Sequence, residues 1–204
     1  MKTATGMISE DSVFNPDTPY IQKGIPSAVL GVITLLFTEL MFFAALISAF
    51  IVNRADVPAS EWPPPGQPRL PVLSTLFNSL FLLVSAFTLA LAVRKYKKDK
   101  KIAFWLILTI LLASLFILLQ GAEWVRLINF GMTSSSGLYA AFFYTIVGAH
   151  AFHALFGVAA LIYIQLRIRR NKKKNLSAEL TAGALYWFFV VGIWPVLYIL
   201  VYLS

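Results

Sequence analysis

The sequence predicts an all-α membrane protein built as a bundle of five transmembrane helices. Hydrophobic residues make up 59% of the 204 residues and charged residues only 13%, whereas a soluble domain is about half apolar and about a quarter charged. The mean hydropathy is +0.77. Five apolar runs each reach the length of about 20 residues that spans a bilayer, and none alternates as a barrel strand does. A polytopic helical bundle is therefore the expected fold.

The five predicted spans follow a polar N-terminal segment. That segment, residues 1–25, has no apolar core of a signal peptide, so we expect it to precede a single transmembrane domain of residues 26–204. A Pro-rich loop, residues 53–70, joins the first two spans. The chain contains no cysteine, which excludes disulfides and thiolate sites. The predicted spans are residues 26–52, 71–94, 102–126, 137–166 and 180–203.

The positive charges predict the orientation of the bundle. Residues 94–101 read RKYKKDKK and residues 167–174 read RIRRNKKK, so twelve of the 17 Lys and Arg residues follow the second and fourth spans. Cytoplasmic loops carry such an excess, which places the N-terminus inside and the C-terminus outside. The net charge of +8 thus indicates topology and contact with anionic lipid headgroups.

Three titratable residues are predicted to lie at similar depth in the membrane. Glu39 occupies the middle of the first span, and His150 and His153, the two histidines of the chain, lie at the middle of the fourth. Positions three apart on a helix share a face, so we expect both histidines to look toward one neighbouring helix. Ala149, Ala154 and Gly157 leave space for close approach of a second backbone.

Three interpretations of Glu39, His150 and His153 stay open at this point. The first is a structural hydrogen bond that joins two helices, because a buried polar group needs a partner. The second is a proton relay or a transporter site. The third is a metal site, although di-iron bundles use four carboxylates with two Glu-x-x-His pairs and this chain offers fewer ligands. We expect Glu39 to hydrogen-bond to one of the two histidines.

Two further groups of polar residues are predicted within the membrane. Asn78, Ser85 and Thr88, together with the adjacent Ser79, give the second span a polar stripe that we expect to face protein. Glu123 lies one turn from the outer end of the third span, where Arg126 at three residues' distance allows a local ion pair.

These segments resemble subunit III of the haem-copper terminal oxidases, in order and over all five spans. FTELMFFAALISAF resembles the acid-bearing helix of that family, with Glu39 as its membrane carboxylate. NSLFLLVSAFT resembles the family pattern Asn-Thr-x-x-Leu-Leu-x-Ser-Ser-x-Thr, and GAHAFHALFG resembles its Gly-x-His-x-x-His-x-x-x-Gly segment. Between them the family has an acid followed by an aromatic residue, then Gly-x-Tyr and Phe-Phe. These features fall here on Glu123, Trp124, Gly137, Tyr139, Phe142 and Phe143.

The last helix departs from the family pattern. The family reads Tyr-Trp-His-Phe-x-Asp-x-x-Trp, whereas this chain reads YWFFVVGIW, with Phe188 in place of His and Val191 in place of Asp. Five spans instead of seven match the short form of the family, which lacks the helices that line one wall of a lipid-filled cleft.

The resemblance implies a subunit without a catalytic or metal site of its own, in a proton-pumping oxidase of a prokaryotic plasma membrane. Haem and copper are expected in the partner subunits I and II, with phospholipid as a further ligand. The implied role is to support assembly, stability and proton uptake of the catalytic subunit, with cytochrome c oxidase favoured. A quinol oxidase subunit III, a nitric oxide reductase-associated relative and a stand-alone proton-coupled transporter are the alternatives.

Overall fold

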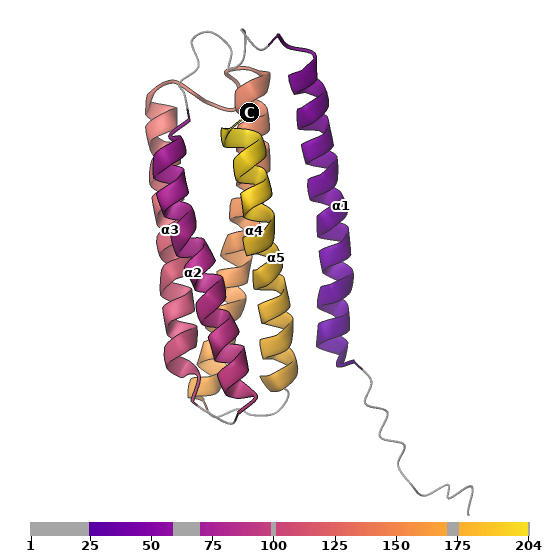
Figure 1. The fold of residues 1–204 in the computed structure, drawn as a ribbon, viewed down its shortest axis with the longest axis vertical. Helices are drawn as coiled ribbons and strands as arrows, with labels where there is room; N and C mark the ends of the chain where they lie inside the picture. Colours follow the sequence, from indigo (N-terminus) through magenta and orange to yellow (C-terminus); the bar gives the residue numbers. More distant parts are fainter. Residues whose placement is uncertain (1–24, 59–69, 99–100, 171–175, 204) are drawn as a thin grey trace, which may run out of the picture.

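The described residues form five long helices, one at each of the five predicted spans (Figure 1). The computed structural model describes residues 25–58, 70–98, 101–170 and 176–203. The predicted polar segment, apart from residue 25, and residues 59–69 of the Pro-rich loop lie outside the described residues. All five helices are long and apolar enough to cross a membrane, which confirms the all-α polytopic bundle. The helices are α1 (Ser27–Ala55), α2 (Val72–Tyr96), α3 (Ala103–Asn129), α4 (Leu138–Arg169) and α5 (Leu176–Tyr202).

The helices extend beyond the predicted spans because a helix does not stop at the edge of the hydrocarbon. They contain between 25 and 32 residues, which corresponds to about 38–48 Å at 1.5 Å per residue, more than the core thickness of about 30 Å. The largest difference is at α5, which begins at Leu176 and not at residue 180. Glu179 lies in its first turn, where the helix dipole favours an acidic side chain, and pairs with Arg167 of α4.

Helix α5 lies at the centre of the packing and α1 lies at its edge. Helix α5 contacts α1, α2 and α4, whereas α1 contacts α5 and, over a smaller area, α4. In Figure 1, α1 accordingly stands to one side of the other four helices. The side chains of Trp187 and Trp194 on α5 are almost completely buried, so aromatic rings fill the centre of the bundle.

The contact between α4 and α5 differs from the close backbone approach expected at Gly157. The space beside Gly157 is taken by the rings of Trp187 and Tyr186, and a methyl group there would lie 2.7 Å from Cε3 of Trp187. A methyl group at Gly183 on α5 would likewise lie 2.7 Å from Cδ1 of Ile164. The small residues therefore admit side chains of the neighbouring helix, because the large aromatic residues of α5 need that room.

A glycine in the left-handed region ends α3. Gly131 has a φ of 90°, and its N–H donates to the Ile128 carbonyl at 2.9 Å while the N–H of Met132 donates to the Leu127 carbonyl at 3.0 Å. This pair of bonds is the Schellman motif. The buried Met132 also offers its carbonyl to the Tyr144 hydroxyl at 2.7 Å, so the uncharged α3–α4 turn is tied to α4.

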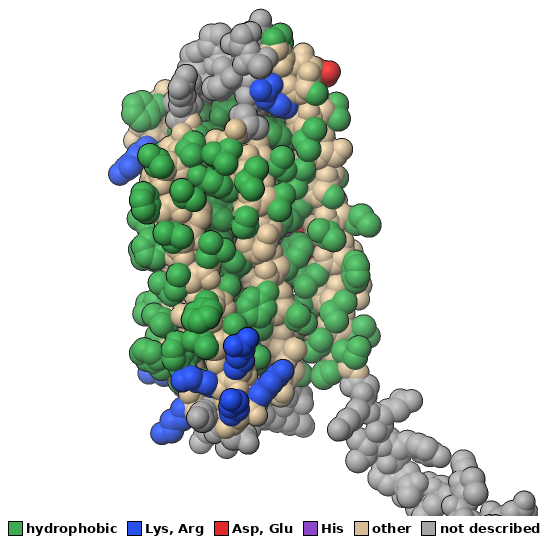
Figure 2. Space-filling view, in the orientation of Figure 1, with side chains coloured by type: hydrophobic (Ala, Val, Ile, Leu, Met, Phe, Trp, Pro, Cys, Tyr) green, Lys and Arg blue, Asp and Glu red, His purple; other side chains and the backbone are tan. Residues whose placement is uncertain are grey.

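The described Lys and Arg residues lie at the two ends of the bundle. Figure 2 shows apolar side chains along the length of the visible face and a group of Lys and Arg residues at the end where α2 and α4 finish. The opposite end carries Arg54, Asp56 and Arg126. The described cations at the first end are Arg94, Lys95, Lys97, Lys98, Lys101, Arg167, Arg169 and Arg170.

Candidate functional site

A carboxyl–imidazole pair joins α1 to α4 within the membrane-spanning region. Oε2 of Glu39 lies 2.7 Å from Nε2 of His153, and the two side chains are 19% and 12% exposed. The ring of Phe43 lies edge-on to the imidazole, with centroids 5.3 Å apart. The hydrogen bond between Glu39 and one of the histidines, as expected from their shared depth, is thus formed by His153.

The surroundings of His153 fix which ring nitrogen carries a proton. Nδ1 of His153 lies 2.6 Å from the Ala149 carbonyl oxygen, and because a carbonyl only accepts, Nδ1 must donate. A bond between Nε2 and Glu39 then requires one proton between the two atoms. Either Glu39 is protonated and donates to a neutral imidazole, or an imidazolium donates to a carboxylate. Both arrangements are neutral overall, which suits a site with little solvent.

His150 does not face Glu39, and the expectation that both histidines look toward one helix is wrong. Its ring packs against Trp194 of α5, with centroids 4.8 Å apart, and against Phe116 of α3 at 6.4 Å. Positions three apart on a helix differ by about 60° in direction, and α1 contacts only a narrow sector of α4. Because of that rotation, the His153 imidazole points toward α1 and the His150 imidazole points toward α3 and α5.

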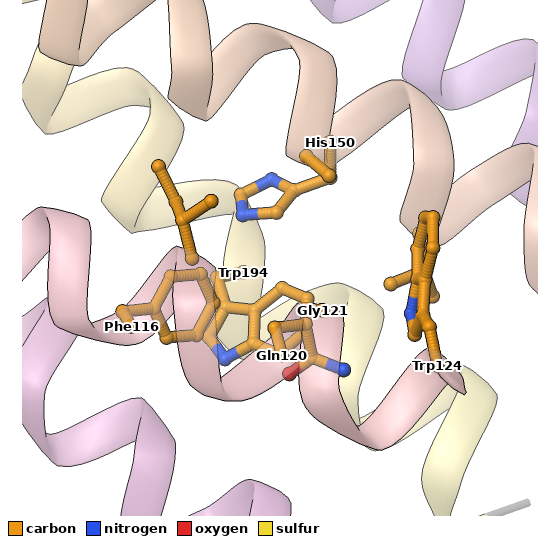
Figure 3. A pocket seen from close by; sticks show the side chains of 9 residues that line it. Phe116, Gln120, Gly121, Trp124, His150 and Trp194 are labelled. Atoms are coloured by element: carbon orange, nitrogen blue, oxygen red, sulfur yellow. The ribbon is translucent and has the colours of Figure 1, made fainter. Parts of the chain in front are cut away.

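His150 borders a cavity of about 100 Å³ between α3, α4 and α5 (Figure 3). The side chain is 1% exposed, and neither ring nitrogen has a hydrogen-bond partner among the described residues. The cavity is lined by Phe116, Ile117, Gln120, Gly121, Trp124, Val147, His150, Ala151 and Trp194.

The polar stripe of α2 faces protein, as predicted, and accepts hydrogen bonds from α5. The indole N–H of Trp187 donates to Oγ of Ser85 at 3.1 Å, and that of Trp194 donates to Oγ of Ser79 at 2.7 Å. Each serine hydroxyl donates its own proton to a carbonyl of α2, which leaves its lone pairs for an indole. Such interhelical bonds hold membrane helices in register.

The rest of the stripe binds α3. Oγ1 of Thr88 lies 2.8 Å from Oγ1 of Thr109, and the Asn78 amide donates to the Phe116 carbonyl at 3.2 Å and to Oε1 of Gln120 at 3.3 Å. All three residues of the predicted face, positions 78, 85 and 88, therefore lie in helix–helix contacts.

Glu123 also joins α2 to α3 and does not pair with Arg126. Its carboxylate accepts hydrogen bonds from the hydroxyls of Ser74 and Thr75, the latter at 2.8 Å, and it is 5% exposed. Among the described residues no ion pair links Glu123 to Arg126. The acid turns toward α2 because two adjacent hydroxyls satisfy it inside the bundle, whereas the Arg126 side chain is exposed.

The sequence interpretation missed the residues that support these sites. Gln120 accepts from Asn78 and donates to the Tyr202 hydroxyl at 2.9 Å, and Tyr202 is an aromatic residue in an aromatic-rich helix. Gln120 lies three residues before Glu123, on the same face of α3, and that spacing was a usable signal. In the described part of the chain, no group of three or more His, Asp or Glu residues is placed to hold a metal ion.

Comparisons with known proteins show which family the chain resembles. The family model described as cytochrome c oxidase subunit III matches residues 2–204. A cytochrome c oxidase subunit 3 of Synechocystis is 30% identical over 100% of this chain and 87% of that protein. The subunit 3 of Corynebacterium diphtheriae is 33% identical over 85% of this chain and 86% of its own length. The cytochrome c oxidase subunit 3 of Podospora anserina is 33% identical over 96% of this chain and 73% of its own length.

Proposed function

Because the chain belongs to the cytochrome c oxidase subunit III family, we propose that it is the subunit without haem or copper in an oxygen-reducing oxidase complex. In this proposal it packs in the membrane beside subunits I and II, which carry the metal centres. Its task is to support assembly, stability and proton uptake of the catalytic subunit. The membership itself supports the oxidase complex and does not favour a quinol oxidase, a nitric oxide reductase system or a stand-alone transporter.

The observation that carries the proposal is the Glu39–His153 pair between α1 and α4. Helix α1 has few buried residues of its own, Val29, Phe43 and Phe50, so a polar contact in hydrocarbon adds strongly to its attachment. A charge at bilayer depth costs about 2.5–3.5 kcal/mol even on lenient scales. A pair that stays neutral while sharing one proton avoids that cost and keeps the proton within reach of a neighbouring subunit.

We propose the orientation that the cationic end indicates. The Lys and Arg residues after α2 and α4 would lie on the cytoplasmic side, with residues 1–25 inside and the C-terminus outside the membrane of a prokaryotic cell. Residues 26–204 would form one transmembrane domain. The relatives from Synechocystis and Corynebacterium diphtheriae are bacterial, which supports the prokaryotic membrane in this proposal.

We propose a phospholipid as the ligand of the surface groove beside α1. An apolar groove of about 240 Å³ runs between the first half of α1, the end of α4 and the start of α5. Val32, Leu35 and Phe156 line it, and Glu179, which pairs with Arg167, lies at its inner end. An acyl chain would fill this groove while the headgroup meets the charged end.

The test replaces Glu39 in the assembled oxidase by glutamine and by alanine. Glutamine keeps a hydrogen bond to His153 but cannot release a proton, whereas alanine removes both. We expect Glu39→Ala to lower retention of this subunit and sustained oxygen turnover, with the haem spectra of the complex unchanged, and Glu39→Gln to retain the subunit. Protons pumped per electron, measured in vesicles, then show whether the pair also serves proton uptake.

Thr38→Val is the matched control, because among the described residues the Thr38 hydroxyl donates to the Leu35 carbonyl of its own helix, at 2.7 Å, and to no other helix. If Glu39→Ala behaves like this control, the proposed role of the pair is wrong. Loss of the haem spectra from a complex that stays assembled would contradict the assignment as a subunit without metal.

A further inference from the structure

The cavity beside His150 contains polar groups that the protein leaves without partners. Both ring nitrogens of His150 and Nε1 of Trp124 are buried and have no hydrogen-bond partner among the described residues. A neutral imidazole offers one donor and one acceptor, and an indole offers one donor. Two helices, α3 and α4, thus bring three unmatched polar atoms to the lining of one cavity (Figure 3).

The neighbouring side chains are already engaged elsewhere. The Trp194 indole N–H donates to Ser79 at 2.7 Å, away from the cavity. The Gln120 amide accepts from Asn78 and donates to Tyr202. None of these bonds includes His150, whereas buried polar groups are almost always hydrogen-bonded.

We propose that this cavity is a binding site for ordered water, which hydrogen-bonds to His150 and Trp124. A water molecule both donates and accepts, so it can serve the two kinds of atom that His150 presents. The volume of about 100 Å³ exceeds the roughly 10–15 Å³ that one buried water requires. An ion is a poor fit because the residues that line the cavity include no Asp, Glu, Lys or Arg.

The site is separate from the Glu39–His153 pair and goes beyond the proposed function. Here His153 already has a partner on each ring nitrogen, Glu39 and the Ala149 carbonyl. The two imidazoles of the chain should therefore differ in one measurable respect: His150 contacts water and His153 contacts protein.

The experiment uses the full chain in lipid nanodiscs with ¹⁵N-labelled histidine. The chain has two histidines, so two imidazoles give the signals, and His153→Gln assigns them. In proton-detected solid-state NMR, we expect a cross-peak between water and the His150 ring nitrogens, and none of comparable strength for His153.

A cavity-filling variant supplies the second arm. A side chain at Gly121 would meet nothing within 4 Å of its Cβ, so Gly121→Leu places a branched side chain in the cavity lining without a clash at Cβ. It should abolish the His150 water cross-peak, whereas Gly31→Leu, equally free of contacts and distant from the cavity, should preserve it. Unchanged His153 signals report an intact fold.

Three results would overturn the water site. These are absence of the water cross-peak in the unaltered chain, a cross-peak from His150 to lipid acyl protons in its place, and persistence of the water contact in Gly121→Leu with intact His153 signals.

Discussion

The substitution Gly157→Ala places a methyl group into the contact between α4 and α5. The new carbon would lie 2.7 Å from Cε3 and 3.0 Å from Cζ3 of Trp187, and 3.3 Å from Cε1 of Tyr186. Optimal contacts between carbon atoms are about 3.5–4.0 Å, so the indole must retreat by close to 1 Å. Trp187 is 0% exposed and has little room for that movement.

The expected cost combines strain with a weakened hydrogen bond. Adding a methylene-sized group to a packed core costs about 1–3 kcal/mol. A displaced indole also lengthens the bond to Ser85, now 3.1 Å, which contributes about 0.5–1.5 kcal/mol. The higher helix propensity of alanine offsets about 0.5–1 kcal/mol of this loss of stability. The net loss of unfolding free energy should be about 1–3 kcal/mol.

Reversible unfolding in mixed micelles, followed by tryptophan fluorescence, measures this loss. Gly192→Ala is the matched control, because its methyl group meets nothing within 4 Å, and it should be neutral or slightly stabilising. Combining Gly157→Ala with Trp187→Phe removes the clashing ring atoms, so a double-mutant cycle should show a coupling that recovers stability. A Gly157→Ala protein as stable as Gly192→Ala would refute the packing argument.

Three other changes test separate contacts of the fold by the same unfolding measurement. Ser85→Ala should cost about 1–3 kcal/mol, because it leaves the buried indole N–H of Trp187 without its acceptor. Gly131→Ala should cost about 1–2 kcal/mol, because a φ of 90° is unfavourable for any residue with a Cβ. Glu179→Gln should cost only about 0–1 kcal/mol and lose its effect in high salt, because the pair with Arg167 is partly exposed. A loss above that range, or no salt dependence, would contradict this last expectation.

The fold could be predicted because few backbone structures are stable in the hydrocarbon core of a bilayer. A backbone in a bilayer must satisfy its own hydrogen bonds, so apolar runs of sufficient length had to be helices. Helix ends were less predictable, since α5 begins four residues before its apolar run. Glu179 in the first turn pairs with Arg167, which lies on another helix, so this contact could not be predicted from the local sequence.

The candidate site was predictable in depth but not in direction. Glu39 and the two histidines lie at similar depth in the membrane, and this shared depth allows the hydrogen bond between Glu39 and His153. The direction of His150 depends on the position of α1 at the edge of the bundle. The sequence likewise offered Arg126 as a partner for Glu123, but in the structure the Glu123 carboxylate accepts hydrogen bonds from two hydroxyls of α2.

The sequence by itself determined that this chain crosses the membrane five times, where its polar residues lie along the membrane normal, and to which family it is similar. Those properties depend on hydrophobicity and on the rise of a helix, which are local. The tertiary structure alone decided which polar residue meets which, because partners are set by the rotation and neighbours of each helix. The two histidines of α4 differ by about 60° in direction, so His153 bonds to Glu39 whereas His150 lies beside a cavity.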